Sequence, residues 1–370
     1  MPFLPRDEAV ARSSGQDRSG YGPAGRELPR LAPYFRALFE QFQTTARAAD
    51  GPVDRYYDLA GVRVLLRLAL PTLTPLTRAL AHRSAAPGDA TLTVCVWESK
   101  SAPGPKPPLA LASEWSARSR PGQDSEDNQI RALYVGTTGT LSMLDTAQRM
   151  ALFQARNPGG LPSSESAAPF LHIFTWWLAR QGRYFVHAGA VGTPAGGVLL
   201  AGKGGAGKST TALACLHSEL LHVGDDYVLL SEAPAPFVYS VYQSAKLHAS
   251  QLWRLPHLAA RMNNSDHLDL EKALLFLDEG YAHKLSEAFP IRAILMPRVT
   301  GRRDTCLLPA SAAQTLDTLI PTSVVELPGL GREGVQAIAR IVGSVPSYVL
   351  ETGTDLAQIP AVILELLHRR

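Results

Sequence analysis

Cysteine, lysine and long apolar runs are all scarce in this sequence. The 370 residues include three cysteines, Cys95, Cys215 and Cys306, which lie far apart and form no CxxC pair. This pattern excludes a disulfide scaffold and a structural zinc site. No stretch reaches about 18 uninterrupted apolar residues, and the most apolar segment, 170–191, is broken by histidines, arginines and a glutamine. The N-terminus carries acidic residues and proline where a signal peptide needs an apolar core. We therefore expect a reducing, cytoplasmic setting and no membrane partner.

The chain also lacks a large excess of positive or negative charge. The chain has 36 Lys+Arg against 33 Asp+Glu, a formal charge of +3, and this balance argues against a general nucleic-acid or membrane-surface binder. Only seven of the basic residues are lysines, and two of them, Lys203 and Lys208, lie in one glycine-rich loop. Hydrophobic residues make up 45% of the chain, which is enough for a sizeable core. A length of 370 residues predicts about two to three domains.

The pattern along the chain divides it into three parts. Residues 1–30 mix Pro, Gly, Ser and Arg without periodicity and are expected to be disordered. Residues 31–156 are expected to form a smaller, β-rich α+β domain, with one helix followed mainly by strands and a loop or linker over 101–129. The segment 157–166 is the expected boundary. From 165 to 370, helical runs alternate with short strands, which predicts an α/β domain.

Local periodicity predicts the individual elements. In the first half a helix is expected over 36–49, strands over 57–70 and 91–97, and a hairpin from 132–135 and 140–144. In the second half a buried helix is expected over 170–179, strands over 184–186 and 198–201, a helix over 209–216 and two amphipathic helices after residue 334.

A glycine-rich loop carries the strongest functional signal. Its GxxxxGK[ST] pattern follows a predicted strand and precedes a predicted helix, as a phosphate-binding loop requires. Glycines let successive backbone N–H groups point at phosphate oxygens. Lys208 would reach the β- and γ-phosphates, and the Ser209 hydroxyl would bind Mg²⁺. The expected nucleotide-binding residues are Gly202, Lys203, Gly204, Gly205, Ala206, Gly207, Lys208, Ser209 and Thr210.

Three further residues are expected to meet this loop. Asp225 and Asp226 follow an apolar run, so they are expected at a strand end that faces the phosphates. One carboxylate could complete the Mg²⁺ shell, for which Asp226 is a candidate, and the other could take a proton from an attacking hydroxyl. His187 precedes a glycine-rich hairpin, which would return it towards the loop and the aspartates. The candidate catalytic residues are therefore Lys208, Asp225, Asp226 and His187.

The order and spacing of His187, the loop 202–210 and the aspartate pair resemble those of HPr kinase/phosphorylase and the HprK-related serine kinases. The resemblance covers residues 165–370 well and 55–150 faintly. It implies a P-loop kinase domain related to phosphoenolpyruvate carboxykinase over 165–370, with ATP and Mg²⁺ as cofactors. It also implies that an aspartate of the pair acts as the base and that the histidine supports it. Which aspartate takes the proton stays open.

Two departures from this family narrow the expected substrate and activity. Thr210 stands where the true HPr kinase has an acidic residue, and the second Mg²⁺-binding glutamate of the family has no match near 241–250. Both argue against HPr itself as the substrate and against reverse phosphorylase activity. Lys246 and Arg298 are the next cationic candidates near the γ-phosphate. A seryl hydroxyl of a peptide or protein is the expected acceptor, with a small-molecule hydroxyl as the alternative, and homo-oligomerisation stays open.

Two other functions fit the same loop. Lys203-Gly-Gly-Ala-Gly-Lys-Ser also matches the deviant loop of ParA/MinD-like ATPases, in which the first lysine acts across a dimer. The position of the loop at residue 203 and the GDD sequence that follows argue against that reading. The other alternative is a kinase-like module that binds a nucleotide or peptide without transfer.

Overall fold

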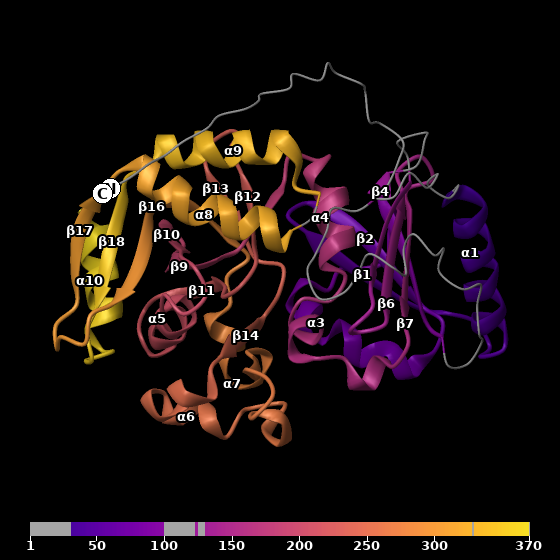
Figure 1. Ribbon diagram of the computed structural model, residues 1–370, viewed down its shortest axis with the longest axis horizontal. Helices are drawn as coiled ribbons and strands as arrows, with labels where there is room; N and C mark the ends of the chain where they lie inside the picture. The colour runs from indigo at the N-terminus through magenta and orange to yellow at the C-terminus, as the bar shows by residue number, and fades with distance from the viewer. Residues whose placement is uncertain (1–30, 100–122, 125–129, 328, 370) are drawn as a thin grey trace, which may run out of the picture.

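The computed structural model describes residues 31–99, 123–124, 130–327 and 329–369. The expectations for 1–30 and for most of 101–129 lie outside these residues. The described residues form a mixed α/β molecule with two large sheets set apart along its long axis (Figure 1).

The first sheet has seven strands in the order β1-β2-β3-β7-β6-β5-β4. Strand β3 runs parallel to both its neighbours, and the other pairs are antiparallel. The strands are β1 Val53–Leu59, β2 Val62–Leu68, β3 Leu92–Glu98, β4 Gln123–Asp124, β5 Ile130–Val135, β6 Thr140–Asp145 and β7 Met150–Ala155.

The strand expected over 57–70 is instead parts of two strands, a correction that a turn explains. Ala60 and Gly61 have φ values of +57° and +82°, and the Gly61 amide donates to Asp58 Oδ1 at 2.8 Å. Left-handed backbone of this kind reverses the chain, so β1 ends before it and β2 begins after it. The expected strand at 91–97 and the expected hairpin are confirmed, as β3 and as β5 with β6.

The second sheet has nine strands. Its main path is β11-β9-β10-β16-β13-β12-β8, and β18 pairs with β16 and β17. The strands are β8 Tyr184–Val186, β9 Ala188–Thr193, β10 Gly196–Ala201, β11 Leu221–Gly224, β12 Val228–Ser231, β13 Phe237–Tyr239, β16 Ala288–Val299, β17 Cys306–Ala310 and β18 Ser347–Thr352.

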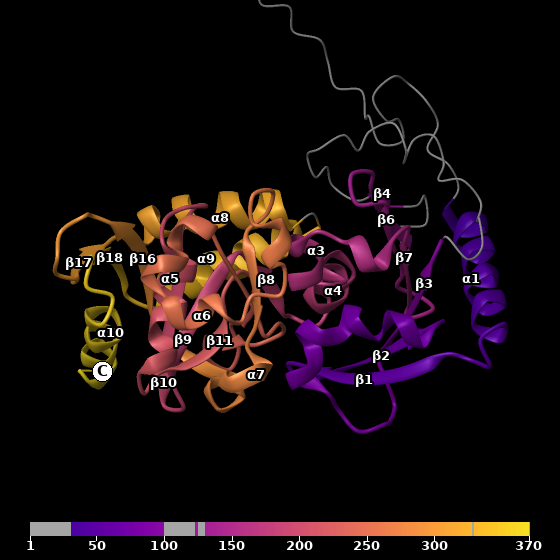
Figure 2. The ribbon, with the colours of Figure 1, turned by 90° about the horizontal axis from the view of Figure 1, so that it is seen from below.

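Helices cover both faces of the second sheet (Figures 1 and 2). Successive side chains of β10 point to opposite faces: Leu199 packs with buried residues of α8 and α9, whereas Val198 and Leu200 pack with α5 and α10. The α-helices are α1 Leu31–Arg47, α3 Ser163–Ala167, α4 Leu171–Ala179, α5 Lys208–Ala214, α6 Pro256–Ala259, α7 Asp278–Tyr281, α8 Ala312–Glu326, α9 Gly331–Ser344 and α10 Gln358–His368. Within the described ranges, none is long and apolar enough to cross a membrane.

A small excursion leaves the second sheet between β13 and β16. It contains a two-stranded sheet, β14 Ser244–Leu247 and β15 Ala273–Phe276, with α6 and α7 beside it. The described residues also contain 3₁₀ helices: η1 Pro71–Arg83, η2 Pro158–Gly160, η3 Cys215–His217, η4 Ala249–Arg254, η5 Ser265–His267 and η6 Ala282–Lys284.

The two sheets share one hydrophobic core. Leu66 of the first sheet, Trp176 of α4 and Phe185 of the second sheet belong to the same cluster of buried side chains, and α4 lies between the sheets (Figure 2). Phe170 joins them through an edge-to-face contact with Phe153, their ring centroids 4.8 Å apart. The predicted division into 31–156 and 165–370 stays a prediction, but packing is continuous across it.

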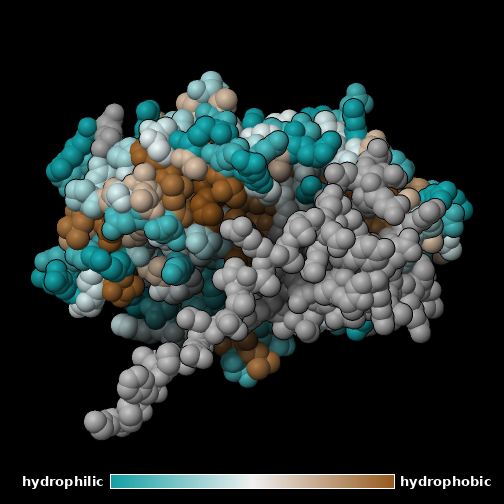
Figure 3. Space-filling view, turned by 45° about the horizontal axis from the view of Figure 1, so that its top comes forward, coloured by the Kyte–Doolittle hydropathy of each residue, from teal (hydrophilic) through white to brown (hydrophobic). Residues whose placement is uncertain are grey.

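Large apolar side chains are strongly exposed only in the second half of the described chain. In the space-filling view apolar surface gathers over this half (Figure 3). The exposed side chains are Trp253, Leu270, Val299, Leu308, Val324 and Val325.

Candidate functional site

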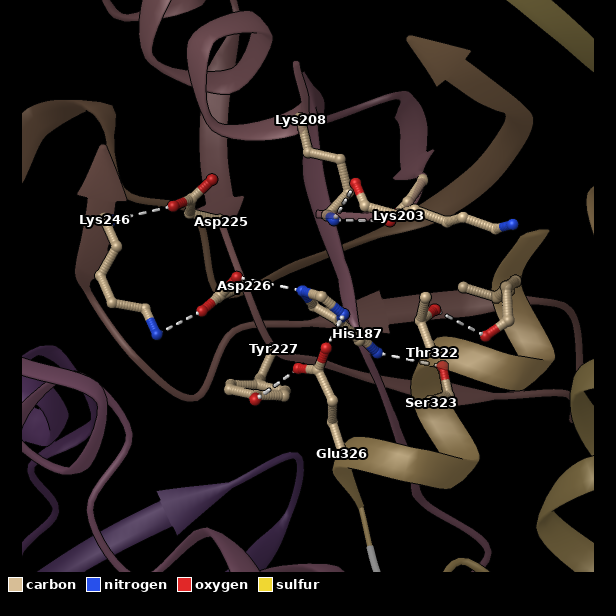
Figure 4. Close-up of polar contacts among 12 residues, drawn as sticks. His187, Lys203, Lys208, Asp225, Asp226, Tyr227, Lys246, Thr322, Ser323 and Glu326 are labelled. Carbon is tan, nitrogen blue, oxygen red and sulfur yellow. Dashed lines mark hydrogen bonds and ion pairs between the residues drawn. The ribbon is translucent and has the colours of Figure 1, made fainter. Parts of the chain in front are cut away.

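The glycine-rich loop connects β10 to α5 as the sequence predicts. Gly205 and Gly207 have φ values of +82° and +103°, conformations that glycine adopts without a steric penalty, and they let the loop wrap tightly. Lys208 begins α5 and is buried, and its Nζ donates to the Gly202 carbonyl at 2.6 Å. The Lys203 side chain is exposed and points away from His187 (Figure 4).

Sheet topology explains why the other candidates meet this loop. Strand β9 is antiparallel to both β10 and β11, so β10 and β11 run in the same direction and end at the same edge. The loop follows β10 at that edge, and Asp225 and Asp226 follow β11. Because β9 runs the other way, its first residue, Ala188, pairs with Ala201 at the end of β10. His187 directly precedes β9, which places it at the same edge.

Asp225 is almost fully buried. Its Oδ2 accepts the backbone N–H of Lys246 at 2.9 Å, and its Oδ1 is buried without a hydrogen-bond partner among the described residues. Burial and the neighbouring Asp226 charge raise the pKa of Asp225 to about 6, opposed by the Lys246 amide, the Ser209 hydroxyl and the Lys208 ammonium. Asp225 is therefore a carboxylate short of stabilising partners.

Asp226 lies in the opposite electrostatic environment. Its Oδ2 is 2.7 Å from the Lys246 ammonium, and its Oδ1 accepts from His187 Nε2 at 3.2 Å (Figure 4). Burial alone would raise the pKa of Asp226, but the contacts with His187 and Lys246 outweigh burial and hold it below its usual range. Asp226 is therefore the more acidic member of the pair.

His187 is held between two carboxylates. Its Nε2 faces Asp226, and its Nδ1 lies 3.0 Å from Glu326 Oε1 at the end of α8. Burial tends to lower the pKa of His187, but the contacts with Asp226 and Glu326 raise it above its ordinary value. The Tyr227 hydroxyl donates to Glu326 Oε2 at 2.9 Å, which fixes that carboxylate. Since both ring nitrogens face acids, the geometry favours the imidazolium form.

His187, Asp226 and Glu326 line a cavity of about 440 Å³ together with the loop, whereas Asp225 lies outside its lining. Its wall includes four lysines, Lys203, Lys208, Lys246 and Lys272, together with Arg254. The carboxylates in the wall are Asp226 and Glu326, and both already contact His187. The balance of charge in the wall is positive, which suits a polyanion such as a triphosphate.

The residues present fit Mg²⁺ only when phosphate oxygens join them. No group of three or more His, Cys, Asp or Glu side chains within the described ranges could hold a metal ion. Mg²⁺ is commonly bound through one or two carboxylates together with substrate phosphates and water. The Ser209 hydroxyl lines the cavity, and the Oδ1 of Asp225, which is buried just behind the wall, would accept a metal-bound water. The geometry therefore favours Asp225 over Asp226 on the metal side, because both oxygens of Asp226 contact cations.

The structure brings together most of the predicted residues and adds others. Lys246 lies in the cavity wall, whereas Arg298 pairs with Glu351 and is not among the lining residues. Sequence reasoning missed Glu326, and it missed Lys272 and Arg254 in the wall. No local motif marks these three residues, since each reaches the cavity from a different distant element.

Comparisons with known proteins identify no family for this chain. No protein-family model and no curated protein matches the sequence. Among solved structures, the Hpr(Ser) kinase/phosphatase from Coxiella burnetii is similar with a TM-score of 0.29 and 11% sequence identity, over 50% of this chain and 94% of that chain. A likeness of this strength carries no argument about function.

Proposed function

We propose that this protein is an ATP-dependent kinase of the HprK-related type that transfers the γ-phosphate to a hydroxyl, by preference a seryl hydroxyl of a peptide or protein. The observation that carries the proposal is one cavity wall that contains Lys208 and Ser209 of the loop together with Asp226 and His187. Phosphoryl transfer needs this combination: a cradle for the triphosphate and a carboxylate that orients the attacking hydroxyl.

Each group has a distinct role in the proposed reaction. The loop amides and Lys208 hold the β- and γ-phosphates. Mg²⁺, held by Ser209 and the phosphates with Asp225 behind it, would neutralise charge on the phosphate oxygens. The acceptor oxygen attacks the γ-phosphorus, the bond to the β-γ bridging oxygen breaks, ADP leaves and the hydroxyl proton passes to Asp226.

The low pKa of Asp226 makes it a weak base, which suits this reaction. The transition state of phosphoryl transfer is loose, so orientation of the hydroxyl matters more than early removal of its proton. The His187 imidazolium and the Lys246 ammonium hold the two oxygens of Asp226 in place. Asp225, with the higher pKa, is the more basic carboxylate but is buried behind the wall.

Two variants test nucleotide binding and transfer separately. Lys208→Ala should abolish the ATP·Mg²⁺-dependent rise in melting temperature, because stabilisation scales with RT ln(1 + [L]/Kd). Asp226→Asn keeps the shape but loses proton affinity, so ATP binding should survive while transfer falls by about 10²–10⁴-fold. Transfer is measured as radiolabel from γ-labelled ATP into peptide pools with a fixed Ser, against the same pools with Ala.

Lys203 separates this proposal from the ParA/MinD-like alternative. Because its side chain is exposed and points away from His187, Lys203→Ala should keep transfer and most of the ATP affinity. Loss of turnover in Lys203→Ala, together with ATP-dependent dimers of the wild type, would support the alternative. Tight ATP binding without label in any acceptor would support a binding module.

A further inference from the structure

A second hollow opens beside the phosphate loop. It has a volume of about 530 Å³ and lies between η4 and the loop that follows β18. It shares Gln251, Arg254, Val299 and Leu356 with the wall of the first cavity, so the two hollows adjoin. The candidate site is therefore longer than a triphosphate requires.

The order of strands gives this extended site a direction. Asp225 and Asp226 follow β11, which lies on one side of β10, while β16 and β18 lie on the other side. Strands β16 and β18 run parallel, and β10 pairs in parallel with β16, so all three end at the edge where the loop lies. With the γ-phosphate directed at the aspartates, a nucleotide that follows the edge of the sheet leaves over β16 and β18.

The second hollow lies on that path. Val299 ends β16, and a Cβ placed on Gly207 of the loop would lie 3.4 Å from its Cγ2. Thr352 ends β18 and lines the first cavity, and the next residues, Gly353–Leu356, line the second. The ends of the two strands thus connect the phosphate loop to the second hollow.

The wall of the second hollow suits a flat aromatic ring. The Trp253 side chain is 77% exposed, whereas the other tryptophans in the described residues, Trp97, Trp176 and Trp177, are buried. Next to it, Arg254 Nη2 donates to the Gly353 carbonyl at 3.2 Å, which fixes the guanidinium across the hollow. In the described ranges no carboxylate pairs with Arg254. Indole and guanidinium groups are the surfaces on which nucleobases stack.

We propose that the hollow between η4 and the loop after β18 binds the aromatic base of the nucleotide, with Trp253 as its stacking surface and Arg254 at the junction with the phosphates. The inference rests on the proposed function, because it requires a triphosphate on the loop. The bound nucleotide would then run from the loop over the ends of β16 and β18, with its base held by Trp253 and Arg254.

Comparing ATP with inorganic tripolyphosphate isolates the base. Both ligands present a triphosphate chain, but only ATP can stack. The wild type should bind ATP·Mg²⁺ more tightly than tripolyphosphate·Mg²⁺. ATP should quench the fluorescence of Trp253, whereas tripolyphosphate should not. In Trp253→Ala, ATP affinity should fall by about 5- to 150-fold, the range that stacking of one base supplies, while tripolyphosphate affinity stays unchanged. Trp253→Phe keeps an aromatic surface and should retain most of the ATP affinity.

The experiment distinguishes a failure of the base-site inference from a failure of the proposed kinase function. If Trp253→Ala binds ATP as the wild type does, the base lies elsewhere and the inference is overturned, while loss of both ligands in Lys208→Ala still supports the loop. If Trp253→Ala instead raises the KM for a Ser peptide at unchanged ATP affinity, the hollow is an acceptor site and the inference is again overturned. If the wild type binds neither ligand, both the proposed function and the inference are wrong.

Discussion

Glu326 gives His187 a property that a lone histidine lacks. With carboxylates at both ring nitrogens, His187 remains protonated to higher pH than an ordinary histidine and keeps Asp226 oriented. In Glu326→Gln the pKa of His187 should fall, so the alkaline limb of the pH–rate profile for transfer should move to lower pH. NMR titration of the His187 ring, in parallel with the rates, checks both effects.

A purely structural role for Glu326 would lower the rate equally at every pH, and that result would contradict the assignment. Tyr227→Phe is the matched control, because it removes the hydroxyl bonded to Glu326 but leaves the charges at His187 in place. It should shift the pH–rate profile less than Glu326→Gln does.

The ion pair between His187 and Glu326 also makes a pH-dependent contribution to the stability of the fold. The pKa of Glu326 is lowered from 4.5, so its contribution is present above that value. The pKa of His187 is raised from 6.5, so its contribution is full below that value and is lost as pH rises through the folded pKa. The melting-temperature cost of Glu326→Gln should therefore be greatest between about pH 4.5 and 6.5 and should shrink at alkaline pH. A cost that grows with pH would have the wrong sign.

At the scale of elements, the turn between α8 and α9 sets where Glu326 lies. Gly329 has a φ of +98°, and a Cβ there would lie 2.4 Å from Trp176 Cδ1. Gly331 has a φ of +70° but meets nothing within 4 Å. Gly331→Ala should cost about 1 kcal/mol from backbone strain, whereas Gly329→Ala adds the overlap and should cost about 2–4 kcal/mol. Urea unfolding of the two variants compares them directly, and equal costs would refute a role for the Trp176 contact.

The sequence predicted the features that local signals mark, and it missed those that depend on long-range contacts. The strand, loop and helix around Lys208 form one continuous segment, and the hairpin after His187 has its own glycines, so both were predictable. The helix expected over 209–216 appears as α5 followed by η3. Glu326, by contrast, lies 99 residues from Tyr227 in the sequence and reaches it only because α8 packs on the second sheet. Trp253 and Arg254 likewise depend on how the excursion after β13 folds back.

At the scale of the whole molecule, the shared core should make unfolding cooperative. The cluster that contains Leu66, Trp176 and Phe185 joins the first sheet, α4 and the second sheet, and a cut after residue 164 would expose its second half to water. We expect a single calorimetric transition for the full chain. A fragment of residues 165–370 should bind an apolar dye and melt well below the full chain. Two separate transitions, or a fragment as stable as the full chain, would show that the halves are independent.

The scarcity of lysine in this chain gives the cavity a chemical signature. Of the five lysines in the described residues, Lys203, Lys208, Lys246 and Lys272 line the cavity, and Lys284 donates to the Ser218 carbonyl instead. Burial lowers the pKa of Lys208, which leaves more of its amine in the nucleophilic, neutral form. An amine-acylating reagent used sparingly would therefore report on the cavity. Most adducts among the described residues would fall on its wall, and a bound triphosphate would protect Lys208.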